Sequence, residues 1–443
     1  MQRNIFGTDG IRTKIGTNQL TLELLPRLGM AIAQWAQEKY KRTPVILLGH
    51  DTRQSCSLVK TSLQSGLLLM NAQIYDAHVL PTPAICNIIH ASSVFDLGII
   101  ISASHNPWYD NGIKIVDAQQ GKLSSLDEQK ISARFDQNSF VADYSMLGQL
   151  HHYSNAHTEY KQSLENIFEK NFLSGKKIVL DCAHGATSTI APHIFTSFGA
   201  HVVAINNQPD GKNINEHCGA VHPELLQKAV VEHNADIGFA FDGDGDRVIA
   251  VAKNGEIKNG DDILTILLDH PIYHHATTIV GTVMTNQGFD TYLHQRNKKL
   301  IRAPVGDKYV SERMEQEKSI IGGEQSGHII LHDYLSTGDG IFTALRLVET
   351  LIRTENWHME TFSKFPQVLI NIPVGVKKDL TLPHLAAIIE HHETLLPQGR
   401  LLVRYSGTEP VLRILVEDSD ASMAYSIGTQ LSERLATQLS FSE

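Results

Sequence analysis

Short apolar runs that end in turn residues recur along this chain, and each is followed by a segment with a helical pattern. Residues 45–49, 99–102 and 177–181 are runs of this kind, and further runs cover residues 279–285 and 300–305. Strands that are apolar along their whole length are buried on both faces, which requires helices on both sides of a mostly parallel sheet. The sequence therefore predicts βαβ units and an α/β fold class.

The strand, turn and helix pattern fills three successive blocks of about 100 to 150 residues, which is the size of a domain. After residue 366 the pattern changes to two closely spaced strands, at residues 401–404 and 411–416, framed by helical segments. Such an arrangement is typical of a small α+β domain. We expect three related α/β domains and a smaller C-terminal α+β domain, with bounds at 1–150, 151–250, 251–366 and 367–443.

The composition excludes two classes of partner. The net charge is -10, with 48 acidic against 38 basic residues, so the chain lacks the broad positive field of a nucleic-acid binder. No uncharged apolar run approaches the ~20 residues of a membrane helix, and the N-terminus lacks a signal-peptide pattern. The four cysteines are far apart, so neither a disulfide framework nor a thiolate zinc site is indicated. We expect a cytoplasmic protein with no nucleic-acid or membrane partner.

The loop Asp-Gly-Asp-Gly-Asp-Arg at residues 242–247 follows an apolar strand and carries three carboxylates within five residues. At ~4 Å and an effective dielectric near 20, each close pair of like charges costs about 4 kcal/mol. A bound cation relieves that repulsion, and an all-oxygen site suits magnesium or calcium better than zinc. The alternative is a solvated acidic turn, which would bear the repulsion in water without compensation.

An EF-hand loop is excluded because it needs glycine at position 6 and glutamate at position 12. Those positions hold Arg247 and Lys253 in this chain. The charges of three aspartates, one divalent ion and Arg247 cancel, so the site has room for an added anion such as a phosphate. We predict that Asp242, Asp244 and Asp246 bind a divalent cation, magnesium or calcium.

A second loop, Ser-Ala-Ser-His-Asn-Pro at residues 102–107, lies at the end of an apolar strand. Small residues at the carboxyl end of a strand are where open α/β sheets place ligands and nucleophiles. A serine hydroxyl needs activation by a base or a metal, and His105 and Lys114 are the nearest candidates in sequence. Taken alone, this loop is equally consistent with the N-cap of the following helix.

A third loop contains Glu324, Ser326 and His328. On an extended chain these three side chains point to one side. They provide a hydrogen-bond acceptor, a hydroxyl and a titratable ring, which suit the hydroxyls or amine of a sugar. Any half-buried polar strand edge has the same pattern.

A fourth loop, Arg-Tyr-Ser-Gly-Thr-Glu-Pro at residues 404–410, lies between the two strands of the last domain. Arginine, hydroxyls and glycine amides together form a phosphate site, because the guanidinium binds phosphate bidentately and backbone N–H groups complete the shell. Arg413 supplies a second cation. A plain hairpin turn is the alternative.

The four loops, in this order and spacing over the whole chain, resemble those of the α-D-phosphohexomutase superfamily. The opening segment at residues 6–12, with residues 209–215 and 324–328, resembles the branch that acts on amino sugars more than the mannose and glucose branches. This resemblance implies one loop from each of four domains around a central cleft.

The resemblance also implies a role for each loop residue. Ser104 becomes the phosphoserine and joins the three aspartates at Mg²⁺, while Arg12, His105, Lys114 and Arg247 support the transferring phosphoryl group. The implied sugar and phosphate contacts are Glu324, Ser326, His328, Arg404, Ser406, Gly407, Thr408 and Arg413. The family arginine is replaced by Lys308 in this chain, and a lysine cannot make a bidentate contact.

The reaction implied by the resemblance converts glucosamine 6-phosphate into glucosamine 1-phosphate through a bisphosphorylated sugar, and it supplies UDP-N-acetylglucosamine biosynthesis. A homodimer is implied by the resemblance alone. Two alternatives stay open: the same chemistry on glucose or mannose phosphates, and a catalytically silent sugar-phosphate-binding protein. The presence of Ser104, the three aspartates and Lys114 argues against the second, because binding alone needs no nucleophile.

Overall fold

The computed structural model describes residues 5–7, 9–137, 140–141, 143–406 and 410–440. The chain forms two compact units. The large unit comprises Met1–Thr282 and Ala303–Glu360, and the terminal unit comprises Val283–Arg302 and Thr361–Glu443. Among the described residues, no helix is both long enough and apolar enough to span a bilayer.

The first sheet of the large unit has the strand order β1-β5-β4-β2-β3-β7, and β6 pairs with β5. Its central strands β3, β2 and β4 are parallel, whereas β5 runs antiparallel to both β4 and β1. The strands are β1 (Ile11–Lys14), β2 (Val45–His50), β3 (Gln73–Val79), β4 (Leu97–Ile101), β5 (Asp110–Asp117), β6 (Gly121–Lys122) and β7 (Gln149–His152). The accompanying helices are α1 (Leu25–Tyr40), α2 (Cys56–Leu69), α3 (Thr82–Ala91) and α4 (Ser125–Phe135).

Helices α1 and α2 lie close together because glycines face each other at their crossing. A Cβ atom built on Gly66 would lie 1.8 Å from the carbonyl oxygen of Pro26, and one on Gly29 would lie 2.3 Å from that of Leu63. The pair packs with α4 and the sheet around a buried core that includes Trp35. This core fixes the strands that deliver the serine loop.

The second sheet has the order β12-β11-β10-β8-β9. All five residues of β10 (Ile237–Phe241) are buried, and this strand runs parallel to β8 (Lys177–Asp181) and antiparallel to β11 (Val248–Ala252). The turn between β10 and β11 is therefore the aspartate loop. The other elements here are β9 (His201–Ile205), β12 (Ile257–Lys258), α5 (Ala156–Glu165), α6 (Thr187–Ser197), the short helix η1 (Gly219–Val221) and α7 (Glu224–Glu232).

The third group of strands in the large unit contains β13 (Thr278–Thr282), β15 (Ile321–Gly323) and β16 (Ile329–Leu331). Strand β15 runs parallel to β13 and antiparallel to β16. The helices of this part are α8 (Gly260–Leu267), α10 (Asp307–Glu317) and α11 (Gly340–Thr354). The turn between β15 and β16 carries the third loop.

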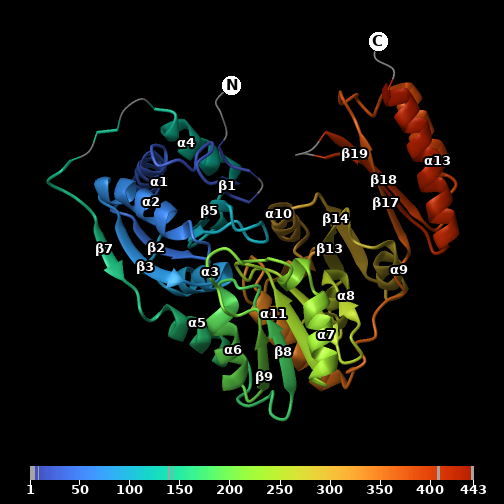
Figure 1. Cartoon of the computed structure of the whole chain (residues 1–443), viewed down its shortest axis with the longest axis horizontal. Coiled ribbons are helices and arrows are strands. Elements are labelled where there is room, and N and C mark those ends of the chain that lie inside the picture. The colour runs from blue at the N-terminus through green and yellow to red at the C-terminus, as the bar shows by residue number, and fades with distance from the viewer. Residues whose placement is uncertain (1–4, 8, 138–139, 142, 407–409, 441–443) are drawn as a thin grey trace. The chain divides into compact units, whose positions relative to one another are not determined.

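The terminal unit contains an antiparallel sheet with the order β17-β19-β18. Its strands are β17 (Gln367–Pro373), β18 (Arg400–Tyr405) and β19 (Val411–Glu417), and its helices include α12 (Pro383–Glu393) and α13 (Ala421–Ser440). Helix α13 packs along β17 and β19, as Figure 1 shows at the red end of the chain. The segment with α9 (Gln287–Gln295) belongs to the same unit.

Two chain segments are joined inside the terminal unit by side-chain hydrogen bonds. Arg400 donates through Nη1 to the carbonyl oxygen of Val283 at 2.6 Å and through Nη2 to that of Thr285 at 3.0 Å. The side-chain amide of Asn286 donates to the carbonyl oxygen of Phe365 at 3.0 Å. The predicted α/β class with a smaller α+β part at the C-terminus is confirmed, whereas the domain bounds from the sequence stay predictions.

Candidate active site

Three of the four loops lie in the large unit, and the first two of them are in contact. Ser104 follows β4, and its hydroxyl donates a 2.6 Å hydrogen bond to Oδ2 of Asp242, which follows β10. Gly243 permits this approach, because a Cβ at that position would lie 2.6 Å from the carbonyl oxygen of Ser104. The serine and aspartate loops thus form one site at the ends of two sheets.

Ser104 is held in an unusual backbone conformation. Its φ is +51°, in the left-handed region that non-glycine residues rarely adopt, and its side chain is fully buried. Its N–H donates to Oγ of Ser102 at 2.9 Å. Its carbonyl oxygen accepts hydrogen bonds from Arg53 and Asn215, both at 2.9 Å. These bonds fix the hydroxyl toward the aspartates.

His105, a predicted catalytic residue, lies beside the hydroxyl with Nδ1 at 3.4 Å from Oγ of Ser104. Burial, with the positive charges of Arg247 and Arg12, lowers the pKa of His105 to about 3. The ring is therefore neutral at neutral pH. The nearer acceptor for the serine proton is Asp242, at 2.6 Å.

The three aspartates converge as the charge argument predicts. One carboxylate oxygen from each of Asp242, Asp244 and Asp246 lies within 4.8 Å of the others, and all three side chains are buried. Oδ2 of Asp244 accepts bonds from Thr82 Oγ1 at 2.5 Å and from Lys114 at 2.8 Å. Its Oδ1 has no hydrogen-bond partner among the described residues.

The close spacing of these carboxylates shifts the pKa values of Asp242 and Asp246 in opposite directions. Burial, together with the charges of Asp246 and Asp244, raises the pKa of Asp242 well above its usual range. Burial also acts to raise the pKa of Asp246, but Lys114 and His328 outweigh it and hold that pKa well below the usual range. A buried carboxylate oxygen without a partner, within a set of hard oxygen ligands, fits a magnesium ion.

Lys114 is the principal cation of the site. Its Nζ lies 2.8 Å from Asp244, 2.9 Å from Asp246 and 3.1 Å from Asp9. Asp9 also forms an ion pair with Arg12. The carboxylates outweigh burial and raise the pKa of Lys114 well above its usual value, so the ammonium stays charged.

Arg247 completes the aspartate loop. Its backbone N–H donates to Oδ1 of Asp242 at 3.1 Å, and its Nε lies 3.9 Å from Oδ1 of Asp246. The structure thus brings the side chains of Ser104, His105, Lys114 and Arg247 together at the aspartates, and Arg12 joins them through Asp9. The sequence argument assigned no role to Asp9, Thr82 or Asn215. Asp9 and Asn215 lie in the segments 6–12 and 209–215 that carry the resemblance, and this was the available signal for them. Nothing in the sequence around Thr82 marks it as a member of this site.

The expectation of an extended strand through the third loop is wrong. Residues 325–327 form a turn between β15 and β16, and Gly327 has a φ of +92° that a side chain would disfavour. The turn buries Glu324 and His328 but leaves Ser326 exposed. The three side chains therefore do not share one side.

His328 contacts the aspartate loop. Its Nδ1 lies 3.7 Å from Oδ1 of Asp246, and its Nε2 accepts a 3.1 Å hydrogen bond from the N–H of Gly338. Glu324 accepts a 2.9 Å bond from the N–H of Gly306, which precedes α10. The third loop thus contacts both the aspartate loop and the residue that precedes α10.

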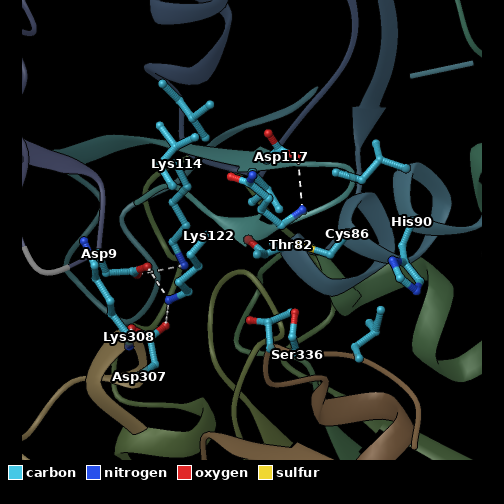
Figure 2. A pocket seen from close by; sticks show the side chains of 18 of the residues that line it. Asp9, Thr82, Cys86, His90, Lys114, Asp117, Lys122, Asp307, Lys308 and Ser336 are labelled. Carbon is cyan, nitrogen blue, oxygen red and sulfur yellow. Dashed lines mark hydrogen bonds and ion pairs between the residues drawn. The ribbon is translucent and has the colours of Figure 1, made fainter. Parts of the chain in front are cut away.

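A cavity of about 390 Å³ extends from these charged residues into the large unit. Figure 2 shows Asp9, Lys114, Lys122 and Asp307 gathered on one side of it, and Cys86 and His90 on another. Lys308 does not lie free in this cavity, because its Nζ pairs with Glu128 at 3.1 Å.

The predicted phosphate residues lie in the terminal unit. Arg404 on β18 and Arg413 on β19 are directly opposite each other, and like charges in that position repel. Burial, with the charge of Arg413, lowers the pKa of Arg404. Both line a small hollow of about 30 Å³. Ser406 follows β18, whereas the predicted Gly407 and Thr408 lie outside the described residues.

The chain matches four family models along almost its whole length. Their descriptions are phosphoglucomutase/phosphomannomutase alpha/beta/alpha domain I at residues 3–142, domain II at 155–255, domain III at 259–368 and the C-terminal domain at 369–431. A protein named phosphoglucosamine mutase from Acinetobacter baumannii is 40% identical over 440 residues, which cover 98% of each chain.

Two solved structures share the fold. One, a phosphoglucomutase/phosphomannomutase family protein from Burkholderia thailandensis, aligns with a TM-score of 0.80 at 23% identity, over 98% of this chain and 97% of that one. The other, N-acetylphosphoglucosamine mutase from Aspergillus fumigatus in complex with GlcNAc-6P and magnesium, has a TM-score of 0.65 at 16% identity, over 98% and 96%.

Proposed function

Since the chain belongs to the phosphoglucomutase/phosphomannomutase family of phosphohexose mutases, we propose that it interconverts glucosamine 6-phosphate and glucosamine 1-phosphate. The observation that carries the mechanism is the 2.6 Å hydrogen bond between Ser104 and Asp242, which places a hydroxyl nucleophile at a carboxylate triad. The choice of an amino sugar rests on the relative named phosphoglucosamine mutase.

In the proposed reaction, Ser104 carries a phosphoryl group at the start. The free hydroxyl oxygen of the substrate bonds to phosphorus while the bond from phosphorus to Oγ breaks, and the proton of that hydroxyl passes by way of a base to the departing Oγ. The product is a bisphosphorylated sugar. This intermediate reorients, and Oγ of Ser104 bonds to its other phosphorus while the bond from that phosphorus to the sugar oxygen breaks. The proton of Oγ passes to that sugar oxygen, which gives the isomeric monophosphate and phosphorylated Ser104.

Catalysis of this kind depends on positioning and on neutralising oxygen charge. Lys114, Arg12 and Arg247 supply positive charge next to Ser104. Asp242, Asp244 and Asp246, with the phosphorylated Ser104, would hold a magnesium ion, which stabilises negative charge on the phosphoryl oxygens. His105 would accept a hydrogen bond as a neutral ring.

The remaining contacts are assigned to the two ends of the substrate. Glu324, Ser326 and His328 would bind the sugar hydroxyls or the amine. The phosphate that does not react would bind to Arg404, Ser406, Gly407, Thr408 and Arg413. Because the two phosphates exchange places during the reaction, these residues have to accept a phosphate from either end of the sugar.

The proposal also covers the pathway, the cellular location and the oligomeric state of the enzyme. Its product feeds UDP-N-acetylglucosamine biosynthesis, its location is the cytoplasm, and its assembly is a homodimer.

A coupled assay on glucosamine, glucose and mannose 6-phosphates tests the proposal. We expect kcat/KM for the glucosamine compound to exceed the others by on the order of tenfold or more, about 1.4 kcal/mol of transition-state stabilisation. Equal or better turnover of glucose or mannose phosphate would transfer the assignment to those substrates. No turnover of any of the three by protein phosphorylated on Ser104 would contradict mutase function altogether.

A further inference from the structure

One carboxylate, Asp9, connects the cations that surround the reacting serine. It forms an ion pair with Arg12, lies 3.1 Å from Nζ of Lys114 and lies 3.0 Å from Nζ of Lys122. Arg12 and Lys114 are the residues assigned above to the transferring phosphoryl group. The position of Asp9 therefore determines where two of these cations lie.

Lys122 holds Asp9 from the other side. It belongs to β6, and its Nζ pairs with Asp307 at the start of α10 as well as with Asp9. Burial disfavours the charged amine, but Asp307 and Asp9 outweigh that effect and raise the pKa of Lys122. The side chain is 23% exposed. Lys122 is thus a charged bridge between the N-terminal segment and α10.

The start of α10 also forms a second ion pair, in which α10 supplies the cation instead of the carboxylate. Lys308, the residue after Asp307, pairs with Glu128 on α4 at 3.1 Å. Two adjacent residues of opposite charge on α10 thus bind a lysine and a glutamate from the first sheet and its helices. Together these pairs fix α10 against the part of the large unit that carries Asp9.

The pairs form a chain of alternating charge that ends at the metal ligands. Asp307, Lys122, Asp9 and Lys114 follow one another, and Lys114 then contacts Asp244 and Asp246. Figure 2 shows the first four of these side chains joined by dashed lines along one wall of the cavity. Among the described residues, the ion pairs of Lys122 are with Asp9 and Asp307 and do not include Asp242, Asp244 or Asp246.

We propose that Lys122 is a positioning residue for phosphoryl transfer, which acts through Asp9 to hold Lys114 and Arg12 at the reacting phosphoryl group, with Asp307 as its second anchor. This role rests on the proposed mutase function. A displacement of about 1 Å in a positioned group can cost ~100-fold in rate. The loss of one bridging charge therefore affects the chemical step more than ground-state binding.

The test replaces Lys122 with methionine, which keeps the length of the side chain and removes its charge. We expect kcat to fall about tenfold or more while KM changes less than about threefold, because the interaction that is lost acts in the transition state. Lys122→Arg, which retains the charge, should recover most of kcat. Lys130→Met is the matched control, since Lys130 is 49% exposed and pairs only loosely, at 3.7 Å, with Asp127.

A second measurement does not depend on activity. Hydrogen exchange of the peptide spanning residues 9–14 should be faster in Lys122→Met than in the wild type, the arginine variant or the control. If the wild type fails to turn over any hexose phosphate, the proposed function fails, and the exchange rates still decide whether Lys122 positions this segment.

Unchanged kcat in Lys122→Met, or unchanged exchange in residues 9–14, would overturn the proposal. If Lys122→Met does not fold, Asp307→Asn provides the same comparison, because it removes the charge of the other anchor of Lys122. A fall in kcat that Lys122→Arg does not restore would also overturn it, since the role assigned to Lys122 is that of a charge.

Discussion

The hydroxyl of Ser104 and the carboxylate of Asp242 are 138 residues apart in sequence and 2.6 Å apart in the structure. This bond joins the loop of one sheet to the loop of another. It means that a phosphoryl group on Ser104 would enter a carboxylate triad directly. The added negative charge has to be neutralised by cations. Lys114 and Arg247 supply part of the positive charge, and a magnesium ion would supply the rest.

Replacing Ser104 with alanine tests the nucleophile. We expect Ser104→Ala to abolish mutase turnover while the fold is retained, because the main-chain bonds of this residue do not involve its hydroxyl. Intact-mass analysis should find one phosphoryl group on active wild-type protein and none on the variant. Ser145→Ala, at an exposed position, is the control. Normal turnover by Ser104→Ala would contradict the mechanism.

Removal of the metal tests the triad. Chelation should stop turnover, and added magnesium should restore it. Asp244→Asn should weaken magnesium binding by on the order of tenfold, since a neutral amide replaces a charged ligand whose Oδ1 lacks a partner among the described residues. Calorimetric titration measures this change, with the exposed Asp143→Asn as its control. Turnover that survives exhaustive chelation would show that the loop is structural.

Replacing Glu324 with glutamine tests sugar recognition. The carboxylate is buried and keeps one bond to the N–H of Gly306, so the amide preserves size and loses charge. We expect Glu324→Gln to lower kcat/KM for all three hexose phosphates and to narrow the preference for glucosamine phosphate, because a site built around a polar group loses discrimination when that group changes. If the preference for glucosamine phosphate over the other two substrates is unchanged, Glu324 does not contribute to recognition of the amine.

Glu349 provides a test of pH-dependent stability away from the site. Burial acts to raise its pKa, but the ring of His270, with Nε2 3.3 Å from Oε2 of Glu349, the hydrogen bonds from Arg353 and the charge of Arg346 outweigh it and lower the pKa to about 2. A carboxyl with a lowered folded pKa stabilises the protein above the pKa of the unfolded chain, 4.5, and that contribution is lost as the pH falls toward 2.

Glu349→Gln should therefore lower the free energy of unfolding by on the order of 2 to 3 kcal/mol at pH 7. The difference from wild type should shrink progressively below pH 4.5. Denaturant unfolding at several pH values measures it, with the exposed Glu169→Gln as the matched control. A destabilisation that is the same at pH 3.5 and pH 7 would show that charge is not its cause.

Local sequence is sufficient to predict a feature when all the residues that determine it lie in one short stretch of chain. The apolar runs predicted buried strands such as β10, and the repulsion within residues 242–247 predicted a cation site before any fold was considered. The contacts of Asp9, Thr82 and Asn215 could not be predicted in that way. Thr82, for example, reaches Asp244 over 162 residues of sequence, so its role depends on tertiary structure alone.

The prediction for Ser326 was wrong because it assumed an extended strand, whereas this segment forms a turn. Alternation along an extended strand would have placed it with Glu324 and His328. The backbone instead turns at Gly327, whose φ of +92° suits glycine. A glycine between two polar residues was therefore the available signal for the turn, and it outweighs the period-two pattern.

The terminal unit is built from two separate segments of the chain, Val283–Arg302 and Thr361–Glu443. The chain passes between the two units at three places, after Thr282, after Arg302 and after Glu360. A fragment that begins at residue 367 would separate Arg400 from its acceptors on Val283 and Thr285, so an independently folded terminal unit has to retain residues 283–302.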